Sequence, residues 1–394
     1  MTLAATRTPP LHTAPPTASA TRLPWYVVAV LFAATSTIVG VIWDISWHRS
    51  IGRDTFWTPA HLAIYLGGVV AGCACGWLAL ETTFGRSAAL RGSAVGFWGF
   101  RAPLGAWLCI WGALAMLTSA PLDNWWHNAY GLDVRVLSPP HTLLALGMLA
   151  IQLGALLLVL AQQNRLVGQG IGTPRAYGVM IAFVAGILLQ NAGILGIEQI
   201  GFANAAHTGL YYKFSAAVFP VVLVATARCA RLRWPATAAA AWYMAISFVM
   251  IWVLELFPAT PKLAPVFNPL THMIPAPFPL LLVFPAAAID VLTRRATLKN
   301  TWLLSIVTAL AFLAVFLLVQ WFAAYFLLSP AARNAFFGVD HWDYSNRLGP
   351  WRYEFWRNNS DPLTPRALAG AAVIAFVSAR IGLWWGDWMA RVRR

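Results

Sequence analysis

Charged residues are scarce in this sequence. They make up 10% of its 394 residues, whereas hydrophobic residues make up 59%. A soluble domain carries about 25% charged residues. The sequence also lacks a nucleotide-binding loop, a serine nucleophile elbow and a zinc-protease HExxH, so ATP-driven and hydrolytic functions have no support. Composition therefore indicates a membrane protein, for which length does not set the number of domains.

The first residues also do not resemble a secretory signal. Residues 1–23 are rich in Pro, Thr and Ala and contain no apolar core, so we interpret them as a disordered cytoplasmic tail. The apolar runs that follow predict an all-α polytopic integral membrane protein with about ten transmembrane helices, each near the roughly 20 residues that cross a bilayer. The expected spans are 24–48, 58–82, 102–127, 138–162, 176–199, 207–228, 236–257, 275–293, 300–327 and 366–388.

Basic residues give the chain a net charge of +14, but they form no single patch, so we expect no nucleic-acid partner. Most lie in the even-numbered gaps between the expected helices, and by the positive-inside rule these gaps are cytoplasmic. Both termini are then cytoplasmic, in an inner or plasma membrane, and the odd-numbered gaps face the periplasm or exterior. The basic residues of the cytoplasmic gaps are Arg86, Arg91, Arg101, Arg165, Arg175, Arg228, Arg231, Arg233, Arg294, Arg295 and Lys299.

Cysteine is rare, with four residues, and none is predicted on the outer face. We therefore expect neither an outer disulfide nor a thiolate-rich outer metal site. Cys73 and Cys75 are close enough in sequence to bind a soft metal, but two small residues at a helix contact are the favoured interpretation.

Histidine, by contrast, is gathered on one side, because seven of the eight fall at outer helix ends or in outer loops. Most acidic residues follow the same pattern, and ionisable groups near a membrane interior are candidates for function. Two segments that contain them are copies of each other, WDISWHRSIGRDTFWTPAH at 43–61 and DNWWHNAYGLDVRVLSPPH at 123–141. The tandem repeat makes two related helical hairpins, 24–82 and 102–162, each with its copy at the outer turn.

The spacing within each copy has a physical consequence. Asp44 and His48 are four residues apart and share one helical face, and a turn then brings His61 to the start of the next helix. Imidazole and carboxylate ligands suit copper, zinc, iron or manganese, and three ligands leave a coordination position open. The sequence therefore predicts one or two transition-metal sites, copper favoured over iron or zinc, at Asp44, His48, His61, Asp123, His127 and His141. A structural role for the repeat stays open.

Further residues are weaker candidates. Asp54 and Asp133 are expected to orient imidazoles as outer hydrogen-bond partners. Two later hairpins within 176–328 repeat the pairing of a carboxylate with a His on the outer rim, and the long aromatic loop 329–365 is expected to act as a lid, ahead of a last helix and basic tail at 366–394. The candidates in these segments are Glu198, His207, Glu255, His272 and His341.

The pattern Asp44-x3-His48-x12-His61 resembles the metal motif in the C-type subunit of copper membrane monooxygenases, the particulate methane and ammonia monooxygenases. The resemblance implies that Asp44, His48 and His61 bind the metal. It covers about 20 residues, the second copy is one residue too long to match, and ten helices are more than that subunit carries.

The favoured hypothesis is a metal-dependent membrane oxidoreductase, monooxygenase-like, with an outer site that acts on a small apolar or lipid-soluble substrate. The alternatives are a transporter or metal-handling permease, a haem protein with paired His ligands, and a non-catalytic subunit of a membrane complex. Expected partners are the bilayer, the substrate, and either partner subunits or further copies of the chain.

Overall fold

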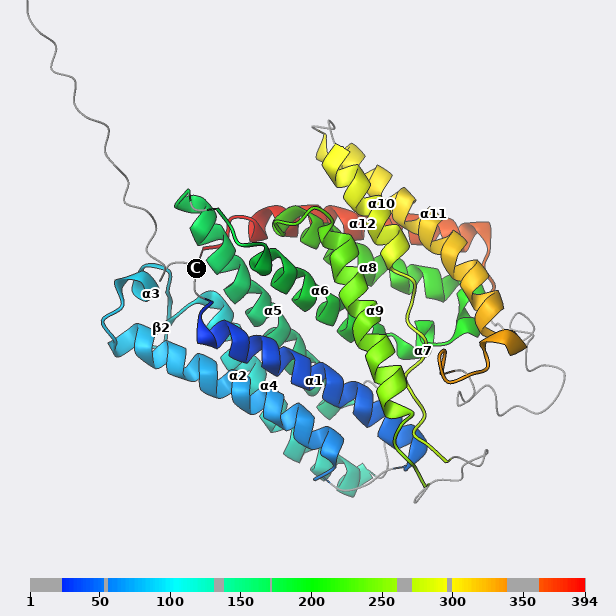
Figure 1. Cartoon of the computed structure of the whole chain (residues 1–394), viewed down its shortest axis with the longest axis horizontal. Coiled ribbons are helices and arrows are strands. Elements are labelled where there is room, and N and C mark those ends of the chain that lie inside the picture. The colour runs from blue at the N-terminus through cyan, green and yellow to red at the C-terminus, as the bar shows by residue number, and fades with distance from the viewer. Residues whose placement is uncertain are drawn as a thin grey trace, which may run out of the picture.

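The computed structural model describes residues 23–52, 56–130, 138–170, 172–260, 271–295, 300–338 and 361–393. In these ranges the chain is mostly helical and has almost no sheet, which confirms the predicted fold class (Figure 1). All but the last residue of the predicted tail 1–23 and most of the predicted lid 329–365 lie outside the described residues, as do Asp54, Asp133 and His341.

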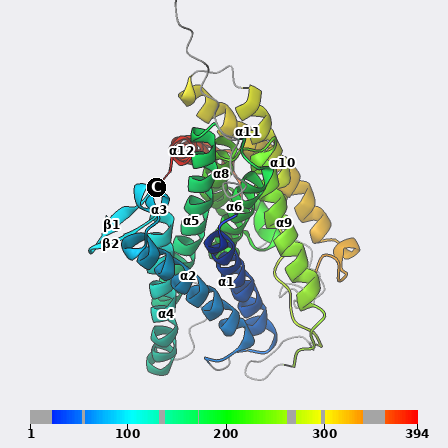
Figure 2. The same cartoon turned by 60° about the vertical axis from the view of Figure 1, so that its left-hand side comes forward.

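The first four long helices form the two predicted hairpins. They are α1 (Trp25–Ser50), α2 (Pro59–Phe84), α4 (Leu104–Tyr130) and α5 (Pro139–Gly168). Figure 2 shows the hairpins side by side, with α2 packed on α4 and α1 on α5. The gap between α2 and α4 contains α3 (Ala88–Gly92) and a small antiparallel hairpin of β1 (Val95–Phe97) and β2 (Phe100–Ala102). Trp98 and Gly99 both have positive φ in its turn, as a two-residue hairpin turn requires.

The repeat extends from the motif into the packing of the two hairpins. Gly67 on α2 faces the Ala33 carbonyl of α1, and a Cβ at Gly67 would come within 2.7 Å of that oxygen. Gly147 on α5 faces the Gly112 carbonyl of α4, where a Cβ would come within 2.8 Å. Both glycines are six residues beyond the second His of their motif, and both carbonyls are eleven residues before its Asp. Close backbone approach through small residues is the usual way in which membrane helices pack, and here both hairpins use it at equivalent positions.

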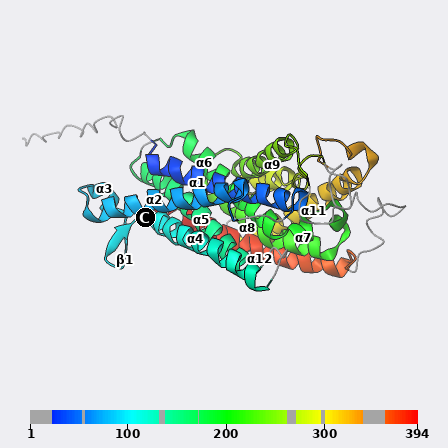
Figure 3. The same ribbon diagram turned by 90° about the horizontal axis from the view of Figure 1, so that it is seen from below.

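The remaining elements build the second part of the molecule. They are α6 (Arg175–Leu195), α7 (Ile197–Ile200), η2 (Ala203–His207), α8 (Gly209–Cys229), α9 (Pro235–Leu254), α10 (Val283–Arg295), α11 (Thr301–Leu327), η3 (Pro330–Ala332) and α12 (Pro365–Met389). The largest contacts among them join α8 to α12, α6 to α9 and α11 to α12. Figure 3 shows α2 and α4 toward one end of the molecule and α9 and α11 toward the other.

Nine helices in the described ranges are long and apolar enough to cross a membrane, which makes this an integral membrane protein. The predicted span 275–293 differs from the other spans. Its helix, α10, begins only at Val283 and has 13 residues, and residues 273–280 before it form neither helix nor strand. Pro275, Pro277 and Pro279 explain the late start, because each removes a backbone donor and disfavours helix at the residue before it.

Candidate metal centre

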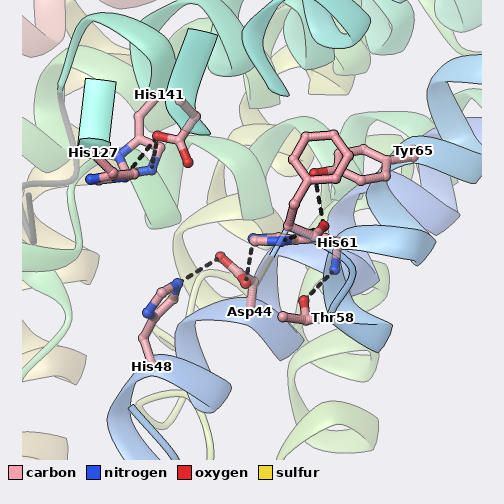
Figure 4. Close-up of polar contacts among 9 residues, drawn as sticks. Asp44, His48, Thr58, His61, Tyr65, His127 and His141 are labelled. Atoms are coloured by element: carbon pink, nitrogen blue, oxygen red, sulfur yellow. Dashed lines mark hydrogen bonds and ion pairs between the residues drawn. The ribbon is translucent and has the colours of Figure 1, made fainter. Parts of the chain in front are cut away.

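The first cluster, defined as Asp44, His48 and His61, lies where α1 ends and α2 begins (Figure 4). Asp44 and His48 are one turn apart near the end of α1. This helix stops where the Ile51 and Gly52 N–H groups both donate to the Trp47 carbonyl. Gly52 has φ +92°, the left-handed conformation that commonly ends a helix. The stop turns the chain back toward α2, whose first turn carries His61.

The start of α2 places His61 by helix capping. The Thr58 hydroxyl accepts a hydrogen bond from the His61 N–H at 3.0 Å, and Pro59 occupies the first helical position. In the second hairpin the Ser138 hydroxyl accepts from the His141 N–H at 3.4 Å, with Pro139 in the equivalent place. In the repeated Thr/Ser-Pro-x-His, the Thr or Ser therefore caps the helix, the Pro is its first residue and the His is its third. The extra residue of the second copy precedes this cap and does not disturb it.

The ligand atoms of the first cluster have the separations of a metal site. Asp44 Oδ1 is 3.2 Å from His61 Nε2, and Asp44 Oδ2 is 3.6 Å from His48 Nε2. Two ligands that each lie about 2.0 Å from a tetrahedral metal are about 3.3 Å apart. The His48 side chain is 43% exposed, whereas those of Asp44 and His61 are 20% and 21% exposed. The cluster is thus open on the His48 side and enclosed on the other.

The proton on His61 can be placed by its second ring contact. His61 Nδ1 lies 3.3 Å from the Phe56 carbonyl oxygen, which can only accept, so Nδ1 carries the proton. Nε2 then presents to the Asp44 carboxylate either a lone pair or a second proton. A lone pair facing a carboxylate at 3.2 Å is repulsive unless a cation lies between them. A backbone carbonyl that fixes the tautomer of a His in this way is the usual outer partner of a metal ligand, so the residues fit a metal ion.

The Tyr65 hydroxyl also donates to the Phe56 carbonyl, at 3.3 Å, and the Tyr65 and His61 rings lie 5.9 Å apart. Sequence reasoning missed both Tyr65 and Phe56. Tyr65 stands four residues after His61 on the same helical face, which is a signal that could have indicated it. Phe56 acts through its backbone, for which residue type gives no signal.

The second cluster, defined as Asp123, His127 and His141, repeats the arrangement between α4 and α5. Asp123 Oδ1 lies 3.0 Å from His127 Nε2 and 3.5 Å from His141 Nε2. The two imidazoles here approach the same carboxylate oxygen, whereas those of the first cluster approach different ones. Within each cluster one ligand atom from every residue lies within 4.8 Å of the others.

The two clusters are neighbours at one end of the helix bundle. Figure 4 shows them side by side, and Asp44 of the first cluster interacts electrostatically with His141 of the second. Tyr65 interacts electrostatically with both Asp44 and Asp123. The packing of α2 on α4 and of α1 on α5 brings the two motifs together, although 79 residues separate their Asp residues in sequence.

The later candidates are placed differently. His207 ends η2 instead of opening a helix. It is 7% exposed, and its ring centroid lies 3.8 Å from that of Trp321 and 5.4 Å from that of Tyr325. Burial lowers the pKa of His207 to about 4. His272, which precedes the predicted span 275–293, lies in an isolated bridge to Pro258 with its ring against the Thr271 hydroxyl. Among the described residues, neither His joins a group of three potential ligands, and neither do Glu198 and Glu255.

The fold and the site together define an all-α polytopic membrane protein with two adjacent Asp-His-His clusters. No protein-family model, curated protein or solved structure matches this chain. The resemblance to the C-type subunit of copper membrane monooxygenases therefore rests on the motif alone and stays a prediction.

Proposed function

We propose that this protein is a membrane metalloprotein that holds a transition-metal ion in the first cluster and an equivalent ion in the second. The observation that carries the proposal is the hydrogen bond from His61 Nδ1 to the Phe56 carbonyl, because it leaves Nε2 facing the Asp44 carboxylate. Two imidazoles and one carboxylate suit copper, iron or zinc, and copper is favoured by the motif resemblance.

The reaction class that fits best is oxidation of a small apolar or lipid-soluble substrate, as in a monooxygenase. A bound metal with three protein ligands keeps a position for oxygen or water and supplies the redox chemistry. The chain's own residues hold that ion. Asp44 provides the negative charge, the two His provide neutral nitrogens, and Phe56 fixes the tautomer of one of them. The exposed side of His48 is the side open to a substrate.

We place the clusters at the periplasmic or outer face of an inner or plasma membrane, with both termini cytoplasmic. Support comes from the opposite end of the bundle, where basic residues gather. There Arg228 pairs with Asp387, and the Asn164 amide donates to the Met389 and Val392 carbonyls, so the ends of α5, α8 and α12 meet. An excess of Arg at that end is typical of the cytoplasmic side.

The test is metal content by elemental analysis of the purified full chain. Three proteins are compared: wild type, a variant with Ala at all three residues of the first cluster, and one with Ala at all three of the second. We expect about two equivalents of metal in the wild type and about one in each variant. Asp387→Asn, at the far end of the bundle, is the matched control and retains the wild-type content.

The same measurement separates the alternatives. Wild-type protein that folds and binds no metal, even after incubation with copper, iron or zinc, would overturn the metalloprotein proposal. Metal lost from only one triple variant would reduce the proposal to a single ion. Oxidation assays with short alkanes and lipid-soluble alcohols follow only if metal is present.

A transporter is the second candidate, and one observation favours it. The non-helical stretch before α10 lies in a span predicted from the sequence, and interrupted helices line the binding sites of many transporters. Uptake of radiolabelled copper into proteoliposomes tests this, because a transporter moves metal across the bilayer whereas an enzyme only binds it.

A further inference from the structure

The stretch before α10 reaches the middle of the membrane-spanning bundle. The Leu280 N–H donates to the Tyr243 hydroxyl at 3.1 Å, and Tyr243 is the ninth of the 20 residues of α9. The Phe278 ring lies 5.4 Å from that of Phe248, further along the same helix. Figure 1 shows this segment as a coloured, non-helical stretch beside α9. Residues 273–280 are thus non-helical backbone that extends about halfway along a spanning helix.

The segment is firmly held where it starts. The Ile274 N–H donates to the Ser50 hydroxyl at 2.6 Å, and the Ile274 carbonyl accepts from the Ser46 hydroxyl at 2.5 Å. Both backbone polar groups of Ile274 are therefore hydrogen-bonded to α1. Further along, no protein donor within the described ranges reaches the carbonyls of residues 275–279. An unpaired backbone group in hydrocarbon costs several kcal/mol, so irregular backbone at this depth occurs where it lines a cavity.

A partly open cavity of about 50 Å³ does lie against this segment, between α1, α6, α7 and α9. Three polar side chains line it, those of Gln190, Tyr243 and Ser247, which are 8%, 4% and 3% exposed. The Ser247 hydroxyl lies 2.8 Å from Gln190 Oε1 and 3.0 Å from the Tyr243 carbonyl oxygen, and neither contact uses the Gln190 amide nitrogen, which is left as a donor. Within the described part of the chain that nitrogen has no acceptor. The rest of the wall is largely apolar, and no charged residue contributes to it.

We propose that this cavity binds a small uncharged molecule with a polar end and an apolar body, of the class of a short alcohol or amide. The Gln190 amide donates to an oxygen of the ligand, the free carbonyls of Ala276, Pro277 and Phe278 accept its hydroxyl or amide hydrogen, and isoleucines of α1 and α6 cover its carbon atoms. The volume admits roughly four water-sized groups. The absence of a charged wall residue excludes an ion, because an unpaired ion at this depth is too costly.

This site is distinct from the metal clusters. Ile42 and Ile45 line the cavity whereas Asp44 between them does not, so the cavity and the first cluster lie on different faces of α1. The proposal therefore stands whether or not the clusters bind metal.

The test uses 2,2,2-trifluoroethanol as the probe and its ¹⁹F linewidth as the readout, with the full chain in detergent micelles. We expect wild-type protein to broaden the line beyond protein-free micelles, and Ser247→Leu, which fills the cavity, to remove more than half of that broadening. Val249→Leu is the matched control, because it adds bulk to the same helix at a residue that is 53% exposed on the outside of the bundle. Trifluoroacetate, of similar size but charged, should show no broadening that depends on Ser247.

Ile45→Phe fills the cavity from α1 and gives a second variant in case Ser247→Leu does not fold. Equal broadening by wild type, both filling variants and the control would mean that the probe meets only the micelle or protein surface, which overturns the site. No broadening beyond protein-free micelles overturns it too, and leaves a cavity that holds water. Trifluoroacetate broadening that Ser247→Leu removes would overturn the uncharged class of ligand.

The Ala variants of the first cluster should broaden the probe line as wild type does, so failure of the metal proposal is distinguishable.

Discussion

Asp44 and His61 face each other across the turn between α1 and α2, with Oδ1 and Nε2 3.2 Å apart, while the other nitrogen of the ring meets a backbone carbonyl. This pair needs a positive charge between its two atoms. Asp44→Asn keeps the shape of the side chain and removes its negative charge. We expect the metal affinity of the first cluster to fall by more than the roughly 10–100-fold that the loss of an outer partner costs.

The affinity is measured by competition with a chelator of known strength, in a background where the second cluster is replaced by Ala. Asp387→Asn is the control, since that carboxylate pairs with Arg228 far from the clusters. If Asp44→Asn bound metal as tightly as its background, the carboxylate would not be a ligand, and a proton shared by Asp44 and His61 would explain the geometry instead.

Helix packing in the first hairpin depends on Gly67. A Cβ there would come within 2.5 Å of Thr37 Cγ2 and 2.7 Å of the Ala33 carbonyl, so Gly67→Ala must push α2 away from α1. Overpacking of this kind typically costs about 1–3 kcal/mol. We expect the midpoint of thermal unfolding in detergent, monitored by circular dichroism, to be lower than that of the wild type. Metal content should fall as well, because Asp44 and His61 lie on the two helices that separate.

Gly76→Ala is the matched control for this prediction. Gly76 lies on the same helix, and a Cβ at its position meets nothing within 4 Å. Ala in place of Gly favours helix by up to about 1 kcal/mol, so this variant should be as stable as wild type or more stable. Equal loss of stability in both variants would show that α2 tolerates no added methyl, irrespective of its contact with α1.

Most of the fold follows from hydrophobic runs, which predicted nine of the spans to within a few residues. The convergence within each cluster was also predictable, because Asp44 and His48 share a helical face and His61 follows a short turn. The interrupted span was not predicted, because residues 275–282 are as apolar as a helix and hydropathy does not register the loss of backbone donors at three prolines. The β1–β2 hairpin was missed because each of its strands has only three residues.

The neighbouring position of the two clusters could not be read from the sequence. It depends on which faces of α2 and α4 pack together, and this is decided by small residues such as Gly72, which lies opposite Ala113. The same limit applies to His207. Its sequence position beside a helix suggested a ligand, but the aromatic rings that bury it come from α11, more than 110 residues later.

Burial of His207 predicts a loss of stability in acid. The unfolded pKa is about 6.5, whereas burial lowers the folded pKa to about 4, so the unfolded state takes up the proton first as pH falls. The free energy of unfolding is therefore unaffected by His207 above about pH 6.5. It decreases progressively as pH falls to about 4, by at most about 3 kcal/mol. We expect His207→Gln to flatten this part of the profile of unfolding midpoint against pH. A profile unchanged by the substitution would assign the acid sensitivity to other groups.

Tyr65 supports the first cluster through a hydrogen bond that the second cluster has no equivalent residue to make. Its hydroxyl donates to the same Phe56 carbonyl that receives His61 Nδ1, so it holds the acceptor that fixes the imidazole. The second cluster has Ala145 at the equivalent position, four residues after His141, and therefore lacks this support. Tyr65→Phe keeps the ring against His61 and removes only the hydroxyl. We expect about a tenfold loss of metal affinity in the first cluster, measured with the second replaced by Ala, and an unchanged unfolding midpoint.

In the reverse background, where only the second cluster remains, Tyr65→Phe should leave metal affinity unchanged. Equal losses in both backgrounds would mean that Tyr65 acts through the packing of α2 on α4, and its assignment as a positioning residue for His61 would be wrong.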